Sequence, residues 1–291
     1  MTILVFGHSG QVATELQRQA PVKALDRHDA DLSVAGQCRA AILTLRPSAV
    51  INAAAYTAVD GAEGEPNLAH SINANAPTEM AEACAELGIP FVHLSTDYVF
   101  DGRGDTAWEP SDPTAPLSVY GKTKLAGEGA VRASGADYAI LRTSWVFSAH
   151  GNNFVKTMLR LAETGDALRI VDDQYGGPTP ACAIAAACLS IAAQLQSDPD
   201  KRGTYHFSGT PDVTWKEFAE AIFEASGQNA AVTGIPTSHY PTPATRPTNS
   251  RLDCGATTEA FGFARPDWKI ALKTVLADLK MATETDPKDT L

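Results

Sequence analysis

Short apolar runs alternate along the chain with stretches in which apolar residues recur every three or four positions. The runs are rich in β-branched and aromatic side chains, which is typical of buried strands, and they cover 3–6, 22–25, 49–52, 91–95, 138–143, 168–171 and 205–208. The helical periodicity covers 11–20, 34–45, 73–87, 119–134, 153–164 and 179–194. This alternation predicts an α/β fold with a Rossmann-like, doubly wound parallel sheet.

The pattern changes after about residue 209. A capped amphipathic helix at 214–226, a Pro/Thr-rich loop at 235–247 and a last helix at 268–280 precede a charged tail, 284–289. We expect residues 1–146 to form the core, with the strands and helix of 168–208 returning to it. We expect residues 147–167 and 209–291 to form a smaller C-terminal substrate-binding lobe, over the carboxyl edge of the sheet where open α/β sheets bind ligands.

Composition narrows the class of function. The formal charge of −11 and the lack of a Lys/Arg cluster exclude nucleic acid as a partner. No apolar stretch is long enough to span a bilayer, so no membrane partner is expected, and the chain begins with a strand rather than a basic leader. Five cysteines without a CxxC pair indicate reduced thiols, and the histidines lack metal-ligand spacing, so we expect no metal site. A cytoplasmic protein with small-molecule chemistry is expected.

A glycine-rich turn follows the first predicted strand. Gly7-His-Ser-Gly10-Gln11-Val12-Ala13 is a GxxGxxA pattern that opens a helix. Glycine permits a tight turn and close backbone approach to a pyrophosphate, and the helix N-terminus supplies free N–H groups. The strand-turn-helix context favours a dinucleotide site over a simple tight turn.

Residues after the next two strands point to the rest of a dinucleotide. Asp26 would accept hydrogen bonds from a free ribose 2′-hydroxyl, which favours NADH, whereas Arg27 would neutralise a 2′-phosphate, which favours NADPH. Asp31 and Leu32 either contact adenine or belong to an N-cap near Ser33. Ala53, Ala54 and Ala55 end the third strand, where small side chains either allow a flat ligand to lie against the backbone or serve packing.

Tyr120 and Lys124 are four residues apart on a predicted helix, so their side chains share one face. Such a pair often lies on a solvated surface. It also has chemical use, because a neighbouring ammonium lowers the pKa of a phenol and makes it a workable proton donor. The pair follows the fourth strand, which ends in Ser95-Thr96-Asp97, and this context favours the chemical interpretation.

The sequence resembles the extended short-chain dehydrogenase/reductase family, and within it the reductases of nucleotide-linked sugars. Segments that carry the resemblance span nearly the whole chain: 7–12, 50–60, 94–102, 120–128, 141–147, 173–179 and 246–253. The resemblance implies that Thr96 hydrogen-bonds the C4 carbonyl of a dTDP-linked 4-keto sugar, that Tyr120 protonates its oxygen, and that Lys124 holds the nicotinamide ribose of NADPH or NADH. Family cofactor contacts match Gly10, Gln11, Val12, Asp31, Leu32, Ala53, Ala54, Ala55 and Leu94.

On the substrate side, the resemblance places Asp97 and Trp145 at the sugar nucleotide. Trp145 after a strand end could stack on a pyranose or thymine ring, or could simply be a core tryptophan. Arg246 and Arg251 could clamp the diphosphate through bidentate pairing, or form surface salt bridges. The related 4,6-dehydratases carry Asp-Glu after the threonine, but here Asp97 is followed by Tyr98, which argues for reduction.

Some alternatives stay open at the level of sequence. Glu15 matches a position that ligates magnesium at a dimer contact in some relatives, although a glutamate in a first helical turn commonly only compensates the dipole. Ala13 and Gly61 replace residues frequent in the family, Gly and Lys. The oligomeric state is undetermined, a homodimer included. The alternative functions are reduction of another nucleotide-linked 4-keto sugar and a non-catalytic regulatory role, like that of the β subunit of methionine adenosyltransferase, which resembles this family.

Overall fold

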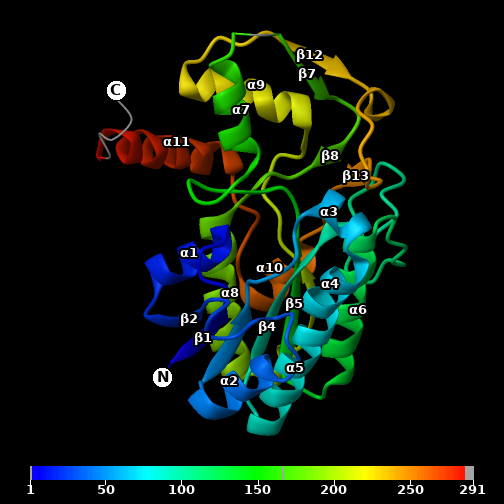
Figure 1. Cartoon of the computed structure of the whole chain (residues 1–291). Coiled ribbons are helices and arrows are strands. Elements are labelled where there is room, and N and C mark those ends of the chain that lie inside the picture. Colours follow the sequence, from blue (N-terminus) through cyan, green and yellow to red (C-terminus); the bar gives the residue numbers. More distant parts are fainter. Residues whose placement is uncertain (1, 166, 286–291) are drawn as a thin grey trace.

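The computed structural model describes residues 2–165 and 167–285 and consists of a sheet-based core with a smaller lobe above it (Figure 1). The described core sheet has six parallel strands in the order β10-β5-β4-β3-β1-β2. Their bounds are β1 Ile3–Phe6, β2 Val22–Leu25, β3 Ala49–Asn52, β4 Phe91–Thr96, β5 Tyr138–Thr143 and β10 Gly203–His206. The strand order reverses between β1 and β3, which makes that point the expected ligand crevice.

Helices cover both faces of this sheet (Figure 1). One face packs against α1 (Gln11–Gln19), α8 (Ala181–Ser197) and α10 (Gly255–Phe261), and the apolar layer there includes the fully buried Leu16 and Ile191. The other face packs against α2 (Gln37–Leu45), α5 (Ala76–Leu87) and α6 (Val119–Ala133), around Met80 and Phe91. Burial on both faces explains why the strands read as continuous apolar runs.

The smaller lobe has its own apolar centre. It is built from α7 (Phe154–Ala162), α9 (Trp215–Ser226) and α11 (Trp268–Thr285), with the two-stranded sheet of β7 (Leu168–Val171) and β12 (Val232–Ile235). Phe147, Phe218 and Trp268 are fully buried at this centre, where the Phe218 and Trp268 rings meet edge to face. Helix α9 begins at a capping box in which Thr214 and Glu217 satisfy each other's backbone N–H groups.

Short elements connect the larger ones. They are α3 (Val59–Gly64), α4 (Pro66–His70), a π-helical turn (Ser71–Asn75), 3₁₀ turns at Asp97–Val99, Pro199–Lys201 and Thr237–His239, and the strands β6 (Val146–Phe147), β8 (Tyr175–Gly176), β9 (Thr179–Pro180), β11 (Val213–Thr214) and β13 (Asn249–Ser250). Strand β6 pairs with β9, and β8 lies between β11 and β13, so segments distant in sequence meet above the carboxyl edge of the core sheet.

The predicted fold class is confirmed, and so is the strand-helix alternation of the core. The prediction that 168–208 returns to the core sheet is wrong for β7, which pairs in parallel with β12 in the smaller lobe. Residues 209–291 were all expected in that lobe, yet Phe261 of α10 packs into the core beside α8.

Helix α2 begins at Gln37, after Gly36 at φ +84°, and not at 34. Within the described residues, no helix has the length and apolar character needed to cross a membrane. The tail predicted at 284–289 lies outside the described residues from 286 on.

Candidate active site

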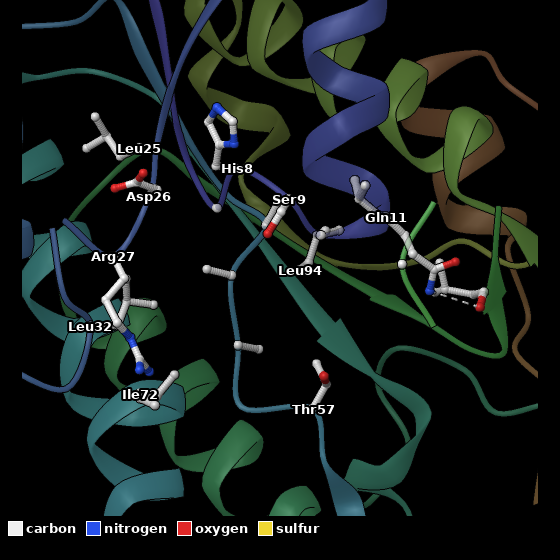
Figure 2. A pocket seen from close by; sticks show the side chains of 18 of the residues that line it. His8, Ser9, Gln11, Leu25, Asp26, Arg27, Leu32, Thr57, Ile72 and Leu94 are labelled. Carbon is white, nitrogen blue, oxygen red and sulfur yellow. Dashed lines mark hydrogen bonds between the residues drawn. The ribbon is translucent and has the colours of Figure 1, made fainter. Parts of the chain in front are cut away.

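A cleft of about 580 Å³ opens at the carboxyl ends of β1, β2, β3 and β4, at the reversal of strand order. Figure 2 shows Asp26, Arg27, Leu32 and Ile72 at one end of it and Gln11 toward the other. The cleft brings together all of the cofactor contacts predicted from sequence, namely Gly7, Gly10, Gln11, Val12, Asp26, Arg27, Asp31, Leu32, Ala53, Ala54, Ala55, Leu94, Tyr120 and Lys124. Its lining combines a glycine turn at a helix N-terminus, charged side chains and small apolar residues, which suits a dinucleotide.

The glycine turn has the geometry that pyrophosphate binding requires. Gly7 has φ +108°, and a Cβ there would lie 3.3 Å from the Ala53 carbonyl oxygen, so a larger residue would be strained. Gly10 is the N-cap of α1 and has no side chain with which to cap the helix, which leaves the first N–H groups of α1 facing the cleft. The residues present therefore fit a dinucleotide diphosphate.

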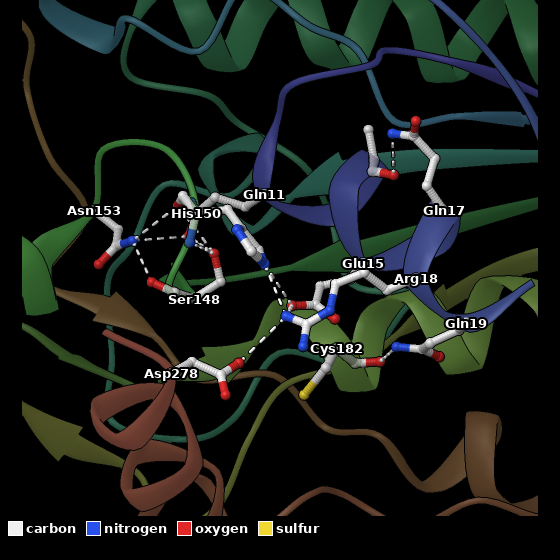
Figure 3. Close-up of polar contacts among 11 residues, drawn as sticks. Gln11, Glu15, Gln17, Arg18, Gln19, Ser148, His150, Asn153, Cys182 and Asp278 are labelled. Atoms are coloured by element: carbon white, nitrogen blue, oxygen red, sulfur yellow. Dashed lines mark hydrogen bonds and ion pairs between the residues drawn. The ribbon is translucent and has the colours of Figure 1, made fainter. Parts of the chain in front are cut away.

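Gln11 ties the loop between β6 and α7 to the glycine turn (Figure 3). Its Oε1 accepts hydrogen bonds from Ser148 Oγ at 3.0 Å and from Asn153 Nδ2 at 3.1 Å, and its Nε2 donates to the Val146 carbonyl at 3.4 Å. Gly151 and Asn152 of the same loop line the cleft. The Gln11 side chain thus positions a wall of the cleft as well as belonging to it.

The adenosine end carries both of the residues expected to select the coenzyme. Asp26 Oδ1 accepts hydrogen bonds from the N–H groups of His28 and Asp29, and these bonds lower the pKa of Asp26. Arg27 is 74% exposed, with its Nε 3.7 Å from Asp31 Oδ2. Asp31 also closes a turn by accepting from Ser33 N and Oγ, whereas the helix N-cap proves to be Gly36 rather than Ser33.

The opposite end of the cleft holds an unsatisfied polar atom. The Thr143 hydroxyl ends β5, lines the cleft, and is buried without a hydrogen-bond partner. A buried hydroxyl without a partner costs free energy unless a ligand supplies one. Leu94 and Val146 beside it give an apolar surface on which a flat ring can lie. This end fits a nicotinamide.

Tyr120 and Thr96 meet at this end of the cleft. Tyr120 follows the N-cap Ser118 at the start of α6, and its phenol lies next to the Thr96 side chain at the end of β4. Burial raises the pKa of Tyr120 to about 12, and the neighbouring Thr96 hydroxyl only partly opposes this effect. The expectation that the neighbouring lysine lowers this pKa is wrong for the free protein, because the cost of burying the phenolate is larger.

Asp97 lies directly beyond Thr96, buried under the smaller lobe. Thr96 Oγ1 donates to Asp97 Oδ1 at 3.1 Å, while Asp97 Oδ2 has no partner among the described residues. Burial raises the pKa of Asp97 to about 6. An unsatisfied carboxylate oxygen next to the reactive pair is suited to accept a hydrogen bond from a ligand hydroxyl.

We expect Asp97→Asn to stabilise the fold at neutral and alkaline pH. The folded chain binds the Asp97 proton more tightly than the unfolded chain does. The protonated carboxyl therefore favours the folded state at low pH, and this stabilisation is lost as the pH rises through about 6 and Asp97 ionises. Removing the ionisation should add about 1–3 kcal/mol to the free energy of unfolding at pH 8 and less at pH 5, measured by urea unfolding. The exposed Asp200→Asn is the control. An equal gain at both pH values would contradict the expectation.

Lys124 is buried one helical turn beyond Tyr120. Its Nζ donates to the Leu94 carbonyl at 2.7 Å and lies 3.4 Å from His93 Nε2. Burial lowers the pKa of Lys124 to about 8, although the negative charge of Glu128 acts in the opposite direction. The lysine is therefore held at the cleft in a fixed place and gives up its proton more readily than a surface lysine.

Glu128 lies on the same helix face, another turn along, and is fully buried against Arg142 of β5. Arg142 donates from Nη2 to Oε2 at 2.7 Å and from Nε to Oε1 at 2.8 Å, and Ser95 Oγ donates at 2.6 Å. Burial alone would raise the pKa of Glu128, but Arg142 outweighs it and the pKa is lowered. This ion pair anchors α6 to β4 and β5, and so fixes the place of Tyr120 and Lys124.

The substrate-side residues lie outside the lining of the cleft. Trp145 has φ +48°, a strained conformation for a bulky residue, and its indole stacks on Trp215 at a centroid distance of 3.5 Å. Arg246 pairs in a bidentate manner with Asp60 of α3 at 2.7 and 3.1 Å. Arg251 stacks over the Tyr175 ring at 4.7 Å. Arg246 thus forms the salt bridge that was the alternative to a diphosphate clamp, whereas Arg251 forms a cation–π contact and its Nε is buried without a partner among the described residues.

Glu15 lies in a polar cluster on the outer side of α1 (Figure 3). Its Oε1 is 3.3 Å from His150 Nε2 and 3.4 Å from Arg18 Nη1, and Arg18 also contacts Asp278 of α11 at 3.2 Å. In residues 2–165 and 167–285, no group of three or more His, Cys, Asp and Glu side chains could hold a metal ion. The cluster connects α1 to the smaller lobe through ion pairs.

Sequence reasoning missed four residues of the site: His93, Glu128, Thr143 and Ser148. Glu128 could have been found, because Tyr120, Lys124 and Glu128 share one helical face at a spacing of four. His93 and Thr143 are polar residues within apolar strand runs, and such residues commonly have a partner. Nothing local in the sequence marks Ser148.

Comparison with known proteins matches this chain to one family and to reductases of a single name. Residues 1–281 match the family of the RmlD substrate binding domain. The dTDP-4-dehydrorhamnose reductase of Shigella flexneri is 44% identical, with 97% of this chain and 99% of that protein covered. A solved dTDP-4-dehydrorhamnose reductase from Clostridium acetobutylicum is 37% identical, with a TM-score of 0.89 and coverage of 97% and 100%. That from Bacillus anthracis, in complex with NADP, is 32% identical, with a TM-score of 0.88 and coverage of 95% and 99%.

Proposed function

The chain belongs to the family of the RmlD substrate binding domain, and from that premise we propose that it reduces the C4 keto group of dTDP-4-dehydro-L-rhamnose to give dTDP-L-rhamnose. The coenzyme is NADPH or NADH. The observation that carries the proposal is the placement of Thr96 beside Tyr120 at the end of a cleft that Lys124 and the glycine turn also line. The reductases of known name in the family align with this chain over nearly its whole length.

The residues divide the work of a carbonyl reduction. Bound NAD(P)H supplies a hydride to the sugar carbon. Tyr120 is fully protonated at neutral pH because its pKa is about 12, so it is ready to give its proton to the sugar oxygen. The Thr96 hydroxyl orients that oxygen against the phenol, and Lys124 would hold the nicotinamide ribose from its place beside Leu94. Positioning and proton donation are the protein's contributions.

We also propose a division of the chain by ligand. Residues 1–146, with α8 and β10, hold the coenzyme, and the smaller lobe with Trp145, Asp97 and Arg246 encloses the sugar nucleotide. Support comes from the cleft, whose lining lies within residues 1–146 except for Gly151 and Asn152, and from the separate apolar centre of the lobe. A cytoplasmic location stays a prediction from the sequence, and the oligomeric state stays open.

The direct test is an assay with purified protein, dTDP-4-dehydro-L-rhamnose, and NADPH or NADH in parallel. Loss of reduced nicotinamide absorbance together with formation of dTDP-L-rhamnose supports the proposal. Turnover only with another nucleotide-linked 4-keto sugar would change the substrate and keep the chemistry. Absence of turnover with every such sugar, in a protein that copurifies with a catalytic partner, would favour a regulatory subunit.

Coenzyme preference can be tested at Arg27. We expect Arg27→Ala to weaken NADPH binding roughly tenfold and to leave NADH binding nearly unchanged, because only a 2′-phosphate pairs with the guanidinium. Asp26→Ala should have the converse effect on NADH. Fluorescence titration of each coenzyme gives both dissociation constants, and Arg39→Ala on α2, outside the cleft, is the matched control. An equal loss of affinity for both coenzymes in Arg27→Ala would rule out this role.

A further inference from the structure

A chain of buried polar groups runs behind the catalytic helix, from β3 through β4 to Lys124. The Ala54 N–H donates to Asn52 Oδ1 at 3.1 Å, Asn52 Nδ2 lies 3.1 Å from His93 Nδ1, and His93 Nε2 lies 3.4 Å from Lys124 Nζ. His93 has no exposed surface, and Asn52 is 1% exposed. The proposed mechanism uses neither residue, yet a buried histidine and asparagine in an apolar strand layer need a reason.

The directions of these hydrogen bonds follow from the backbone. The Ala54 N–H can only donate, so it fixes the oxygen of the Asn52 amide on its own side. The amide nitrogen must then face His93 Nδ1, which has to accept the hydrogen bond. A neutral imidazole that accepts at Nδ1 carries its proton on Nε2, and that N–H faces Lys124 Nζ.

The imidazole stays neutral over the working pH range. Burial, and then the charge of Lys124, lower the pKa of His93 well below its ordinary value. Lys124 Nζ therefore meets an acceptor in the Leu94 carbonyl and a donor in His93. An ammonium cannot accept from that N–H, whereas the uncharged amine can, through its lone pair.

The other charged groups near Lys124 come from three elements. On α6 itself, Glu128 favours the ammonium and Tyr120 is uncharged at neutral pH. Arg142 of β5 is neutralised by its pair with Glu128. Asp97, beyond β4, acts on Tyr120. Burial opposes Glu128 in setting the pKa of Lys124, and His93 is the neighbour that presents an N–H to Lys124 Nζ.

We propose that His93 is a positioning residue for the reduction: Asn52 holds it in the tautomer with the proton on Nε2, and its N–H favours the uncharged form of Lys124. The expected pH dependence of activity rests on the proposed function, whereas the expected tautomer of His93 does not. Tyr120 acts next to a lysine whose charge responds to pH near neutrality, and His93 sets where that response occurs. Activity should therefore fall as Lys124 loses its proton, at a pH of about 8.

The structural half is tested on the free wild-type protein. Nitrogen NMR of protein labelled with ¹⁵N-histidine distinguishes a pyridine-type Nδ1 from a pyrrole-type Nε2. We expect the resonances of His93, assigned by their loss in His93→Phe or by through-bond experiments, to show the proton on Nε2 from pH 6 to 9. A proton on Nδ1, or a doubly protonated ring, would overturn the proposal. This result needs neither substrate nor coenzyme.

The kinetic half compares His93→Phe with a matched variant. His93→Phe removes the N–H, so the ammonium is less disfavoured and the alkaline limb of kcat should move up by on the order of one pH unit, a tenfold gain in relative rate above the limb. His206→Phe replaces another fully buried histidine beside a cation, Arg142, and should leave the limb in place. An unmoved limb in a folded His93→Phe protein overturns the proposal. Failure of all variants and of wild type to reduce any keto sugar counts against the proposed function, while the NMR result still decides the tautomer.

Discussion

Replacing Tyr120 with phenylalanine should lower kcat for the keto sugar by roughly two to four orders of magnitude. Two titratable side chains lie at Thr96, the phenol of Tyr120 and the carboxyl of Asp97. The pKa of Asp97 is about 6, so Asp97 is mostly ionised at neutral pH and the phenol is the acid of the two. Since phenylalanine keeps the ring packed edge to face against Tyr98, the fold and coenzyme binding should be retained. Steady-state kinetics at saturating coenzyme, with the coenzyme dissociation constant measured separately, tests both statements.

The control for this substitution is Tyr138→Phe. Tyr138 begins β5 at the amino end of the sheet, opposite the cleft, so its loss of a hydroxyl should leave kcat within about twofold. If Tyr120→Phe turns over at the wild-type rate, another group donates the proton and the mechanism is wrong. If kcat is kept and only the Michaelis constant rises, Tyr120 serves in binding instead.

Replacing Glu128 with glutamine should lower the free energy of unfolding by about 3–5 kcal/mol. The change leaves the Arg142 guanidinium, 2% exposed, without its carboxylate, and it replaces one oxygen that accepts from Arg142 with an amide NH₂ group that cannot accept. Because the folded protein lowers the pKa of Glu128, its contribution is present above the ordinary range of a glutamate and is lost as the pH falls through the lowered value. The difference between variant and parent should therefore shrink in acid. Urea unfolding at neutral and at acid pH measures it.

A double substitution separates the electrostatic contribution of the ion pair from the contribution of the side-chain volume that it occupies. Glu128→Leu with Arg142→Met removes both charges and should be much less destabilising than the sum of the single variants. The exposed pair of Arg39 and Glu86 gives the comparison, since Glu86→Gln should change the free energy of unfolding by less than about 1 kcal/mol. A loss below that value in Glu128→Gln would mean that the buried pair does not anchor the helix.

Much of the core fold was predictable because its determinants are local. The strands β1, β3 and β5 are short apolar runs, and Gly7 follows β1 at φ +108°, a backbone conformation that favours glycine, before the next helix starts at Gln11. The pairing of β7 with β12 was not predictable. Residues 168–171 have the apolar pattern of a core strand. They pair with β12 instead, because the smaller lobe, with Phe147 and Trp268 buried in it, forms its own apolar centre.

In the candidate site, too, some features follow from local spacing and others from tertiary packing. A spacing of four on a helix puts Tyr120 and Lys124 on one face, and any helix does this. The pKa of each depends on burial, which is a property of what packs above: the sequence predicted a lowered pKa for Tyr120, and burial raises it. The two side-chain partners of His93 are in two other elements, Asn52 in β3 and Lys124 in α6, and no spacing along the chain reveals them.

The sequence by itself determined the class of fold, the glycine turn, the reactive pair and the family, because these depend on local pattern and on short motifs kept in order. The tertiary structure decided which lobe receives β7, how Gln11 holds the wall of the cleft, and which way the imidazole of His93 donates. Those features depend on contacts between residues far apart in the chain, and desolvation at such contacts sets the proton affinities on which the chemistry depends.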